Sequence, residues 1–183
     1  MPDYRRAQTP GAMYFFTVNT LQPQRFLLDD DVRAALREGI ERVRTTLPFS
    51  IDAWVVLPDH LHCLWTLPEG DADFSTRWRI IKTVVTQRCS ARLAKPGLLS
   101  VRRAAKGQST LWQQRFWEHQ VRDDMDFARH VDYIHWNPVK HGLVARVADW
   151  PYSSVHRYLR QGLLPANWAG VGIEDADGKL FGE

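Results

Sequence analysis

The chain has 183 residues, which is the length of one domain with at most a short appendage. Its residues are 44% hydrophobic and 25% charged with a net charge of +3, a composition that excludes an intrinsically disordered chain. No stretch reaches the roughly 18 apolar residues that a membrane helix needs, and no signal-peptide pattern opens the chain, so we expect a cytoplasmic protein without a membrane partner.

The first part of the chain predicts a strand, a helix and two more strands, in that order. Residues Ala12–Asn19 are rich in aromatic side chains and predict a buried strand. The aspartates Asp29 to Asp31 cap a helix that runs to about Thr46. Two strands follow, at Phe49–Leu57 and Leu61–Leu67.

The middle of the chain combines an amphipathic helix with a run of positive charge. Phe74, Trp78, Ile81 and Val85 step by four, three and four residues, the spacing of one helix face. The segment Phe74–Trp117 holds seven arginines, three lysines and no Asp or Glu, so it carries +10 and the rest of the chain −7. Such a run can be merely a solvated face, but together with tryptophans it favours a nucleic-acid partner.

The last part of the ordered pattern predicts a loop, a strand and a helix. Residues from about Ala94 to Thr110 predict a mobile loop, and Arg115–Val121 a fourth strand. Asp123 and Asp124 cap a final main helix, which Pro138 and Gly142 close.

This order of elements predicts an α+β fold of the ferredoxin-like or RRM-like kind. The pattern is βαββαβ, an antiparallel sheet with helices on one face, followed by an additional C-terminal helix that carries Tyr133. We expect residues 1–144 to form the domain and residues 145–183 to form a C-terminal extension that packs on it or trails from it.

Two histidines at the third strand are candidate metal ligands. Strand side chains alternate, so His60 and His62 share one face while Leu61, Cys63 and Trp65 share the other. Two imidazoles on one face can close on a single cation. The pattern is short, and a pair of half-exposed histidines without a ligand is the alternative interpretation.

The final helix places a tyrosine and an asparagine on one side. Asp126, His130, Tyr133 and Asn137 are each three or four residues apart, beside a core stripe that includes Val131. A phenol needs a polarised target to act as a nucleophile, and a metal supplies one at a phosphate. The side-chain carbonyl oxygen of Asn137 suits a third ligand position on the metal. The alternative interpretation of Tyr133, taken alone, is a tyrosine of an amphipathic helix that packs its ring and exposes its hydroxyl.

Two stretches resemble a known group of enzymes. Leu57–Trp65 (LPDHLHCLW) and Val131–Val144 (VDYIHWNPVKHGLV) resemble the single-tyrosine His-hydrophobic-His (HUH) transposases, with REP-associated tyrosine transposases as the nearest subgroup. Further matches occur in the same order at Tyr14–Asn19, Trp65–Asp71 and Arg115–His119.

The resemblance implies an enzyme that cuts and rejoins single-stranded DNA at repeated palindromic hairpin elements. It implies that Tyr133 is the nucleophile and forms a 5′-phosphotyrosine, and that His60 and His62 hold Mg²⁺ or Mn²⁺. Relatives carry a polar ligand at the position of Asn137 but vary there. The resemblance transfers no role to His119, Asp126 or His130. It favours a monomer, with a dimer as the alternative.

A set of basic and aromatic residues is expected to contact the DNA, either at the hairpin foot, on phosphates or by stacking. These residues are Tyr4, Arg5, Arg6, Arg77, Arg79, Lys82, Arg102, Arg103, Arg115, Trp117, Lys140 and His141. Three rival functions stay open: a catalytically silent nucleic-acid-binding protein, a metal phosphoesterase that uses water as its nucleophile, and an RNA-binding module.

Overall fold

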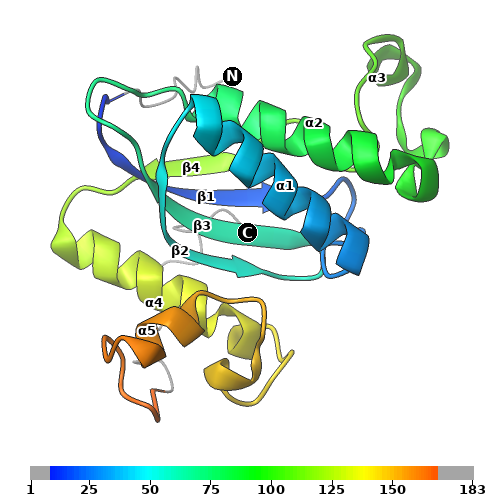
Figure 1. Ribbon diagram of the computed structural model, residues 1–183. Coiled ribbons are helices and arrows are strands. Elements are labelled where there is room, and N and C mark those ends of the chain that lie inside the picture. Colours follow the sequence, from blue (N-terminus) through cyan, green and yellow to red (C-terminus); the bar gives the residue numbers. More distant parts are fainter. Residues whose placement is uncertain (1–8, 169–183) are drawn as a thin grey trace, which may run out of the picture.

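A four-stranded antiparallel sheet forms the centre of the computed structural model, which describes residues 9–168 (Figure 1). The strand order is β2-β3-β1-β4, the order of a ferredoxin-like sheet, and this confirms the predicted fold class. The strands are β1 (Met13–Asn19), β2 (Ser50–Val56), β3 (His60–Thr66) and β4 (Trp117–Gln120).

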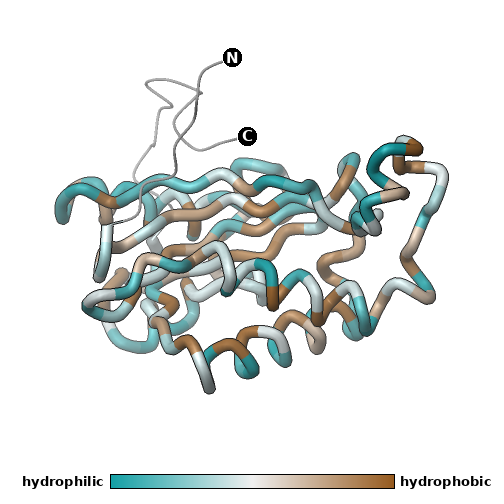
Figure 2. Tube along the Cα trace, turned by 90° about the horizontal axis from the view of Figure 1, so that it is seen from above, coloured by the Kyte–Doolittle hydropathy of each residue, from teal (hydrophilic) through white to brown (hydrophobic). Residues whose placement is uncertain are grey.

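Helices cover both faces of this sheet. Within the described residues they are α1 (Asp30–Thr46), α2 (Phe74–Leu93), α3 (Val101–Ala105), α4 (Asp124–Lys140) and α5 (Val155–Arg160). No helix within residues 9–168 is long and apolar enough to cross a membrane. Seen from above, brown apolar positions alternate with teal ones along the helical turns (Figure 2). The buried apolar residues of α1 and α2 belong to the core between these helices and the sheet.

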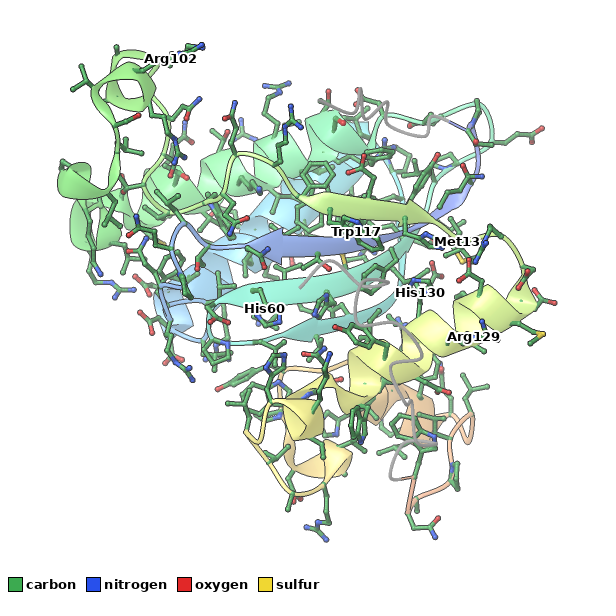
Figure 3. All side chains as sticks on the ribbon, turned by 180° about the vertical axis from the view of Figure 1, so that it is seen from behind. Met13, His60, Arg102, Trp117, Arg129 and His130 are labelled. Atoms are coloured by element: carbon green, nitrogen blue, oxygen red, sulfur yellow. The ribbon has the colours of Figure 1, made fainter. Side chains whose placement is uncertain are left out.

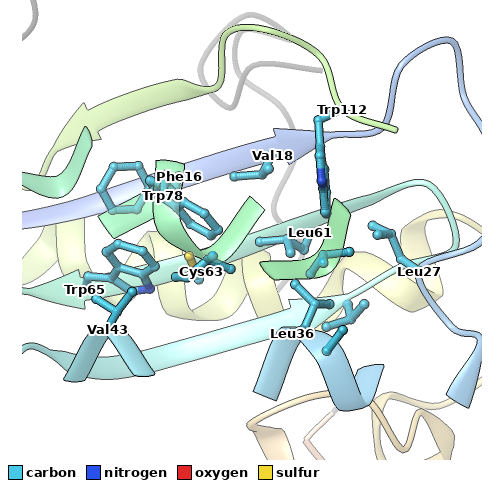
Figure 4. Packing of buried hydrophobic residues seen from close by; sticks show 14 of the residues in the cluster. Phe16, Val18, Leu27, Leu36, Val43, Leu61, Cys63, Trp65, Trp78 and Trp112 are labelled. Carbon is cyan, nitrogen blue, oxygen red and sulfur yellow. The ribbon is translucent and has the colours of Figure 1, made fainter. Parts of the chain in front are cut away.

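Alternation along the strands divides the buried residues into two layers. Phe16, Leu61 and Trp65 lie in the core between the sheet and the pair α1 and α2 (Figure 4). Phe15 and Leu64, one position away, lie in a second core with residues of α4. His60 and His62 have the parity of Leu64, so they share one face of β3, as the alternation in the sequence predicted. The structure shows that this face is the one that looks toward α4.

Close packing of α1 on α2 depends on one glycine. A Cβ atom at Gly39 would lie 3.1 Å from the Cα of Ile81, closer than ordinary van der Waals contact. The two helices therefore approach each other at a position where any larger side chain would push them apart.

Two local expectations differ from the structure. The segment predicted as a mobile loop contains a 3₁₀ turn, Pro96–Leu98, and the short helix α3. Pro138 does not end α4, which continues to Lys140. A proline this near the C-terminus removes one backbone donor, while the next turn still closes through the His141 N–H, which donates to the Asn137 carbonyl. Gly142, with φ 65°, follows the helix end as expected.

The described part of the C-terminal extension pairs with the outer edge of β2. The Val56 N–H donates to the Tyr152 carbonyl, and the Trp54 N–H donates to the Ser154 hydroxyl, both over 2.9 Å. The Trp150 indole N–H donates to the Val56 carbonyl over 3.0 Å. These bonds satisfy backbone groups that an open sheet edge would leave exposed.

A buried histidine in this region makes stability depend on pH. His135 on α4 lies 2.9 Å from the Ser154 hydroxyl, and burial, followed by the nearby charge of Arg157, lowers its pKa to about 3. The unfolded chain takes up a proton near pH 6.5, but the folded chain does not. The contribution of His135 to the unfolding free energy is therefore fully present above pH 6.5 and is lost as the pH falls toward 3.

We expect His135→Gln to flatten this acid dependence. As the pH falls from 7 to 4.5, His135 should lower the unfolding free energy of the wild-type protein by about 3 kcal/mol. In the variant this decrease should be absent. Urea unfolding at a series of pH values measures the slope, with His141→Gln at an exposed histidine as control. An unchanged slope in His135→Gln would contradict the assignment.

Candidate active site

His60 and His62 lie side by side at the start of β3, where the sequence placed them. Their ring centroids are 4.9 Å apart, and His62 is fully buried. Figure 3 shows His60 on the sheet face that looks toward α4. The β2–β3 connection through Pro58 and Asp59 is a tight turn, closed by the Leu57 N–H, which donates to the backbone carbonyl of His60. This hydrogen bond fixes the position of His60.

Two oxygen atoms fix the orientation of these rings. His60 Nδ1 lies 2.8 Å from the Asp59 carboxylate, and His62 Nδ1 lies 2.9 Å from the Thr17 hydroxyl. An Nδ1–H that donates to an oxygen places the lone pair of the ring on Nε2, the form in which histidine binds metals. The Nε2 atoms of both rings are buried. Asp59 and Thr17 escaped the sequence prediction, although Asp59 adjoins the motif.

Helix α4 brings Tyr133 to the same place. The Tyr133 ring centroid lies 5.2 Å from that of His62 and 6.0 Å from that of Phe15, and the side chain is only 1% exposed. The Lys140 ammonium lies 5.0 Å from the centre of the tyrosine ring. A positive charge beside the phenol favours the approach of a phosphate group. The tyrosine and both histidines belong to one chain, so no exchange of helices between chains is needed to assemble them.

Asn137 lies between Tyr133 and His141, the two residues whose rings pack against the histidines of β3. One helical turn before it, Tyr133 packs on His62, and one turn after it, the ring of His141 lies 5.2 Å from that of His60. The Oδ1 atom of Asn137 is buried. Two imidazole nitrogens and an amide oxygen therefore occur on facing elements, which is a donor set that fits a divalent metal ion.

A second group of residues links the start of α4 to β4. His119 Nε2 lies 2.9 Å from the Asp126 carboxylate, and the Nδ1 of His130 lies 2.7 Å from the Asp126 carbonyl oxygen. Desolvation opposes ionisation of Asp126, but hydrogen bonds from His119 and the Arg122 N–H outweigh it and lower the pKa to about 2. Burial lowers the pKa of His130.

The candidate ligand atoms of His119, Asp126 and His130 all lie within 4.8 Å of one another, so by composition this group is a second place for a metal. The His119 and His130 rings, however, are stacked at 4.8 Å with an angle of 21° between their planes, an orientation in which the in-plane lone pairs do not converge well. The ring of His130 also packs 4.7 Å from Phe15, which in turn contacts Tyr133. We interpret the group as a hydrogen-bonded link that holds the tyrosine helix. In the sequence, Asp126 and His130 were indicated only by the helix stripe that they share with Tyr133.

The residues expected to bind DNA fall into separate places. Lys140 lies beside Tyr133, and His141 lies beside His60. Trp117 lies on the same sheet face, 5.8 Å from Phe15 by ring centroids. Tyr4, Arg5 and Arg6 lie outside the described residues. The others belong to α2 or to the segment after it: Arg77, Arg79, Lys82, Arg102, Arg103 and Arg115.

Arg77 does not fit the expected phosphate contact. Its side chain is fully buried, and its guanidinium donates to the Asp71 carboxylate and to the carbonyls of Leu47 and Pro48. These bonds tie the start of α2 to the end of α1. Its charge predicted a phosphate contact for Arg77, but the sequence could not show that loop carbonyls would surround its guanidinium.

Comparisons with known proteins agree with this geometry. No family model matches the chain. A REP-associated tyrosine transposase of Escherichia coli (strain K12) is 47% identical over 170 residues, which cover 93% of this chain and 92% of the relative. The chain belongs to the REP-associated tyrosine transposases. It is thus a tyrosine transposase, as the two sequence motifs implied.

Two further relatives extend the match over the whole fold. A protein of Haemophilus influenzae named for the same family is 40% identical over 173 residues, covering 93% of this chain and 94% of its own. A solved REP-associated tyrosine transposase, bound to a REP hairpin, superposes with a TM-score of 0.80 at 44% identity and covers 100% of this chain and 98% of the other.

Proposed function

We propose that this transposase cleaves and rejoins single-stranded DNA at the foot of repeated palindromic hairpins, with Tyr133 as its nucleophile. The observation that carries the proposal is the distance of 5.2 Å between the Tyr133 and His62 rings, beside His60, within one chain. A hairpin substrate is supported by the solved relative, which is bound to a REP hairpin.

The metal of this site is proposed to be Mg²⁺ or Mn²⁺, held by His60, His62 and Asn137. The two oriented imidazoles and the buried amide oxygen support this ligand set. A divalent ion bound there would polarise a phosphate oxygen and so make the phosphorus a better electrophile.

Tyr133 performs the covalent step. Its phenolic oxygen forms a bond to phosphorus as the bond to the 3′ oxygen of the neighbouring nucleotide breaks, which leaves a 5′-phosphotyrosine and a free 3′-hydroxyl. The phenol gives up its proton, and the leaving 3′ oxygen gains one. One phosphodiester replaces another, so a 3′-hydroxyl from a second strand can reverse the step and join the strands without ATP.

The DNA contacts proposed for this reaction lie on two sides of the protein. Lys140 and His141 are placed to bind backbone phosphates beside the tyrosine, and Trp117 to stack on a base. Arg79, Arg102, Arg103, Arg115 and Lys82 form a basic region along and beyond α2, and Tyr4, Arg5 and Arg6 are proposed to contact the hairpin foot. Because one chain supplies the nucleophile and the histidines, we propose a monomer.

Trapping the covalent intermediate tests this function. A hairpin-bearing single strand with a label 3′ of the cleavage point, incubated with the protein and Mn²⁺, should yield a labelled protein band on a denaturing gel. A water-dependent phosphoesterase would release both fragments without labelling the protein. Efficient cleavage with no labelled protein would therefore overturn the phosphotyrosine mechanism while leaving the metal site in place.

A further inference from the structure

Phe15 lies at the centre of the sheet face that carries the candidate site. It belongs to β1, which pairs with β3 on one side and with β4 on the other, so hydrogen-bonded strands hold its backbone on both edges. In the register of these pairs, Phe15 lies opposite Leu64 of β3 and His119 of β4. Its side chain is fully buried. A ring at this position is therefore held firmly, and residues of α4 can pack against it.

The Phe15 ring contacts both halves of the proposed site. The ring of His62 is stacked on it, with centroids 5.5 Å apart and 21° between the two ring planes. The ring of Tyr133 meets it edge-on at 6.0 Å. One side chain of β1 thus contacts a proposed metal ligand from β3 and the proposed nucleophile from α4. The position of the phenol relative to the histidines depends on the ring that both contact.

A second residue of α4 packs on the same ring. The ring of His130 lies 4.7 Å from that of Phe15, and its Nδ1 lies 2.7 Å from the Asp126 carbonyl oxygen at the start of the helix. Figure 3 shows His130 on α4 and Trp117 on β4 on this side of the sheet. His130 and Tyr133 are three residues apart, so they lie on one face of the helix. Contact of both with one ring fixes the rotation of α4 about its axis and its height above the sheet.

We propose that Phe15 is a positioning residue for the cleavage reaction, whose ring sets the place of the Tyr133 phenol relative to the histidine pair. The inference rests on the proposed function, because it takes Tyr133 as the nucleophile. A smaller side chain leaves space into which the tyrosine ring moves. Displacement of a reacting group by about 1 Å lowers a rate by as much as about 100-fold. Because Phe15 is fully buried, it acts on the reaction through Tyr133 and not by contact with DNA.

The next residue along β1 provides the matched control. Phe16 is equally buried, but its side chain lies in the core between the sheet and the pair α1 and α2, away from Tyr133. Phe15→Leu and Phe16→Leu remove the same atoms from the two faces of one strand, so both should lower the melting temperature by similar amounts. At saturating Mn²⁺ and hairpin DNA, Phe15→Leu should cleave about 30-fold more slowly than the wild-type protein, and Phe16→Leu within about threefold of it. The DNA concentration that gives half the maximal rate should change by less than about threefold in either variant.

A measurement without metal or DNA completes the test. In protein labelled with fluorotyrosine, the fluorine NMR line of Tyr133 is identified by its absence from Tyr133→Phe. This line should broaden or split in Phe15→Leu, because the ring has gained room to move, and remain single in Phe16→Leu. Equal cleavage rates in the two leucine variants, or an unchanged Tyr133 line in Phe15→Leu, would overturn the proposal.

Two provisions keep the result decisive. If Phe15→Leu does not fold, Phe15→Met and Phe16→Met, which keep more of the side-chain volume, take the place of the leucine pair. If the wild-type protein forms no covalent adduct with hairpin DNA, the proposed function fails. The NMR comparison then still decides whether Phe15 positions the tyrosine, so the two failures are distinguishable.

Discussion

Tyr133→Phe should abolish cleavage and covalent attachment of labelled hairpin DNA while leaving DNA binding intact. Phenylalanine keeps the ring that packs on His62 and Phe15 and lies beside Lys140, so the fold of the site should persist. Only the attacking oxygen is lost. Removal of a nucleophile typically lowers the rate by at least about 1,000-fold, which corresponds to about 4 kcal/mol of transition-state free energy. Single-turnover cleavage assays and denaturing gels measure both effects.

A second tyrosine provides the matched control. Tyr158 lies on α5, a different helix from the one that carries Tyr133. Its hydroxyl donates to the Asp52 carbonyl over 3.0 Å. Tyr158→Phe should therefore retain cleavage within about threefold, even where the lost hydrogen bond lowers stability by about 1 kcal/mol. A Tyr133→Phe protein that cleaves at the wild-type rate would show that water is the nucleophile and that Tyr133 only packs.

The parts of the site predicted from sequence depend on simple periodicity. Strand alternation placed His60 and His62 on one face, and helical spacing placed Tyr133 and Asn137 on one side of α4. The two faces meet because α4 packs on the sheet face that carries the histidines, where the rings of Tyr133 and His62 lie 5.2 Å apart. Sequence alone predicted the order of elements, and the motif resemblance supplied the pairing of the histidines with the tyrosine.

Other features could not be predicted because they depend on long-range contacts. Thr17 reaches His62 only because β1 pairs with β3 in the register that sets Thr17 opposite His62. His119 meets Asp126 through the turn between β4 and α4, and Arg77 is buried by carbonyls from the end of α1. Charge counting assigned Arg77 to the DNA-binding surface, since composition does not distinguish an exposed cation from one that is enclosed by the loop of its neighbours.

The largest effect apart from the nucleophile is expected at the two histidines. His60→Gln and His62→Gln should each lower Mn²⁺-supported cleavage by about 100-fold or more, because each removes one of three proposed ligands. Glutamine approximates the volume of imidazole, so the packing of His62 on Phe15 and Tyr133 changes little. Mn²⁺ binding measured directly by water-proton relaxation should weaken in parallel, without dependence on cleavage.

The same titration distinguishes the two groups that could hold a metal. If the ion binds at His60 and His62, then Thr17→Val should weaken Mn²⁺ by about tenfold through loss of the oriented imidazole, whereas His119→Gln should leave Mn²⁺ affinity unchanged. His119→Gln should instead lower the melting temperature, because it removes a hydrogen bond to the Asp126 carboxylate at the start of α4. A loss of Mn²⁺ binding in His119→Gln, with normal binding in His62→Gln, would place the metal at the β4–α4 link and remove it from the tyrosine.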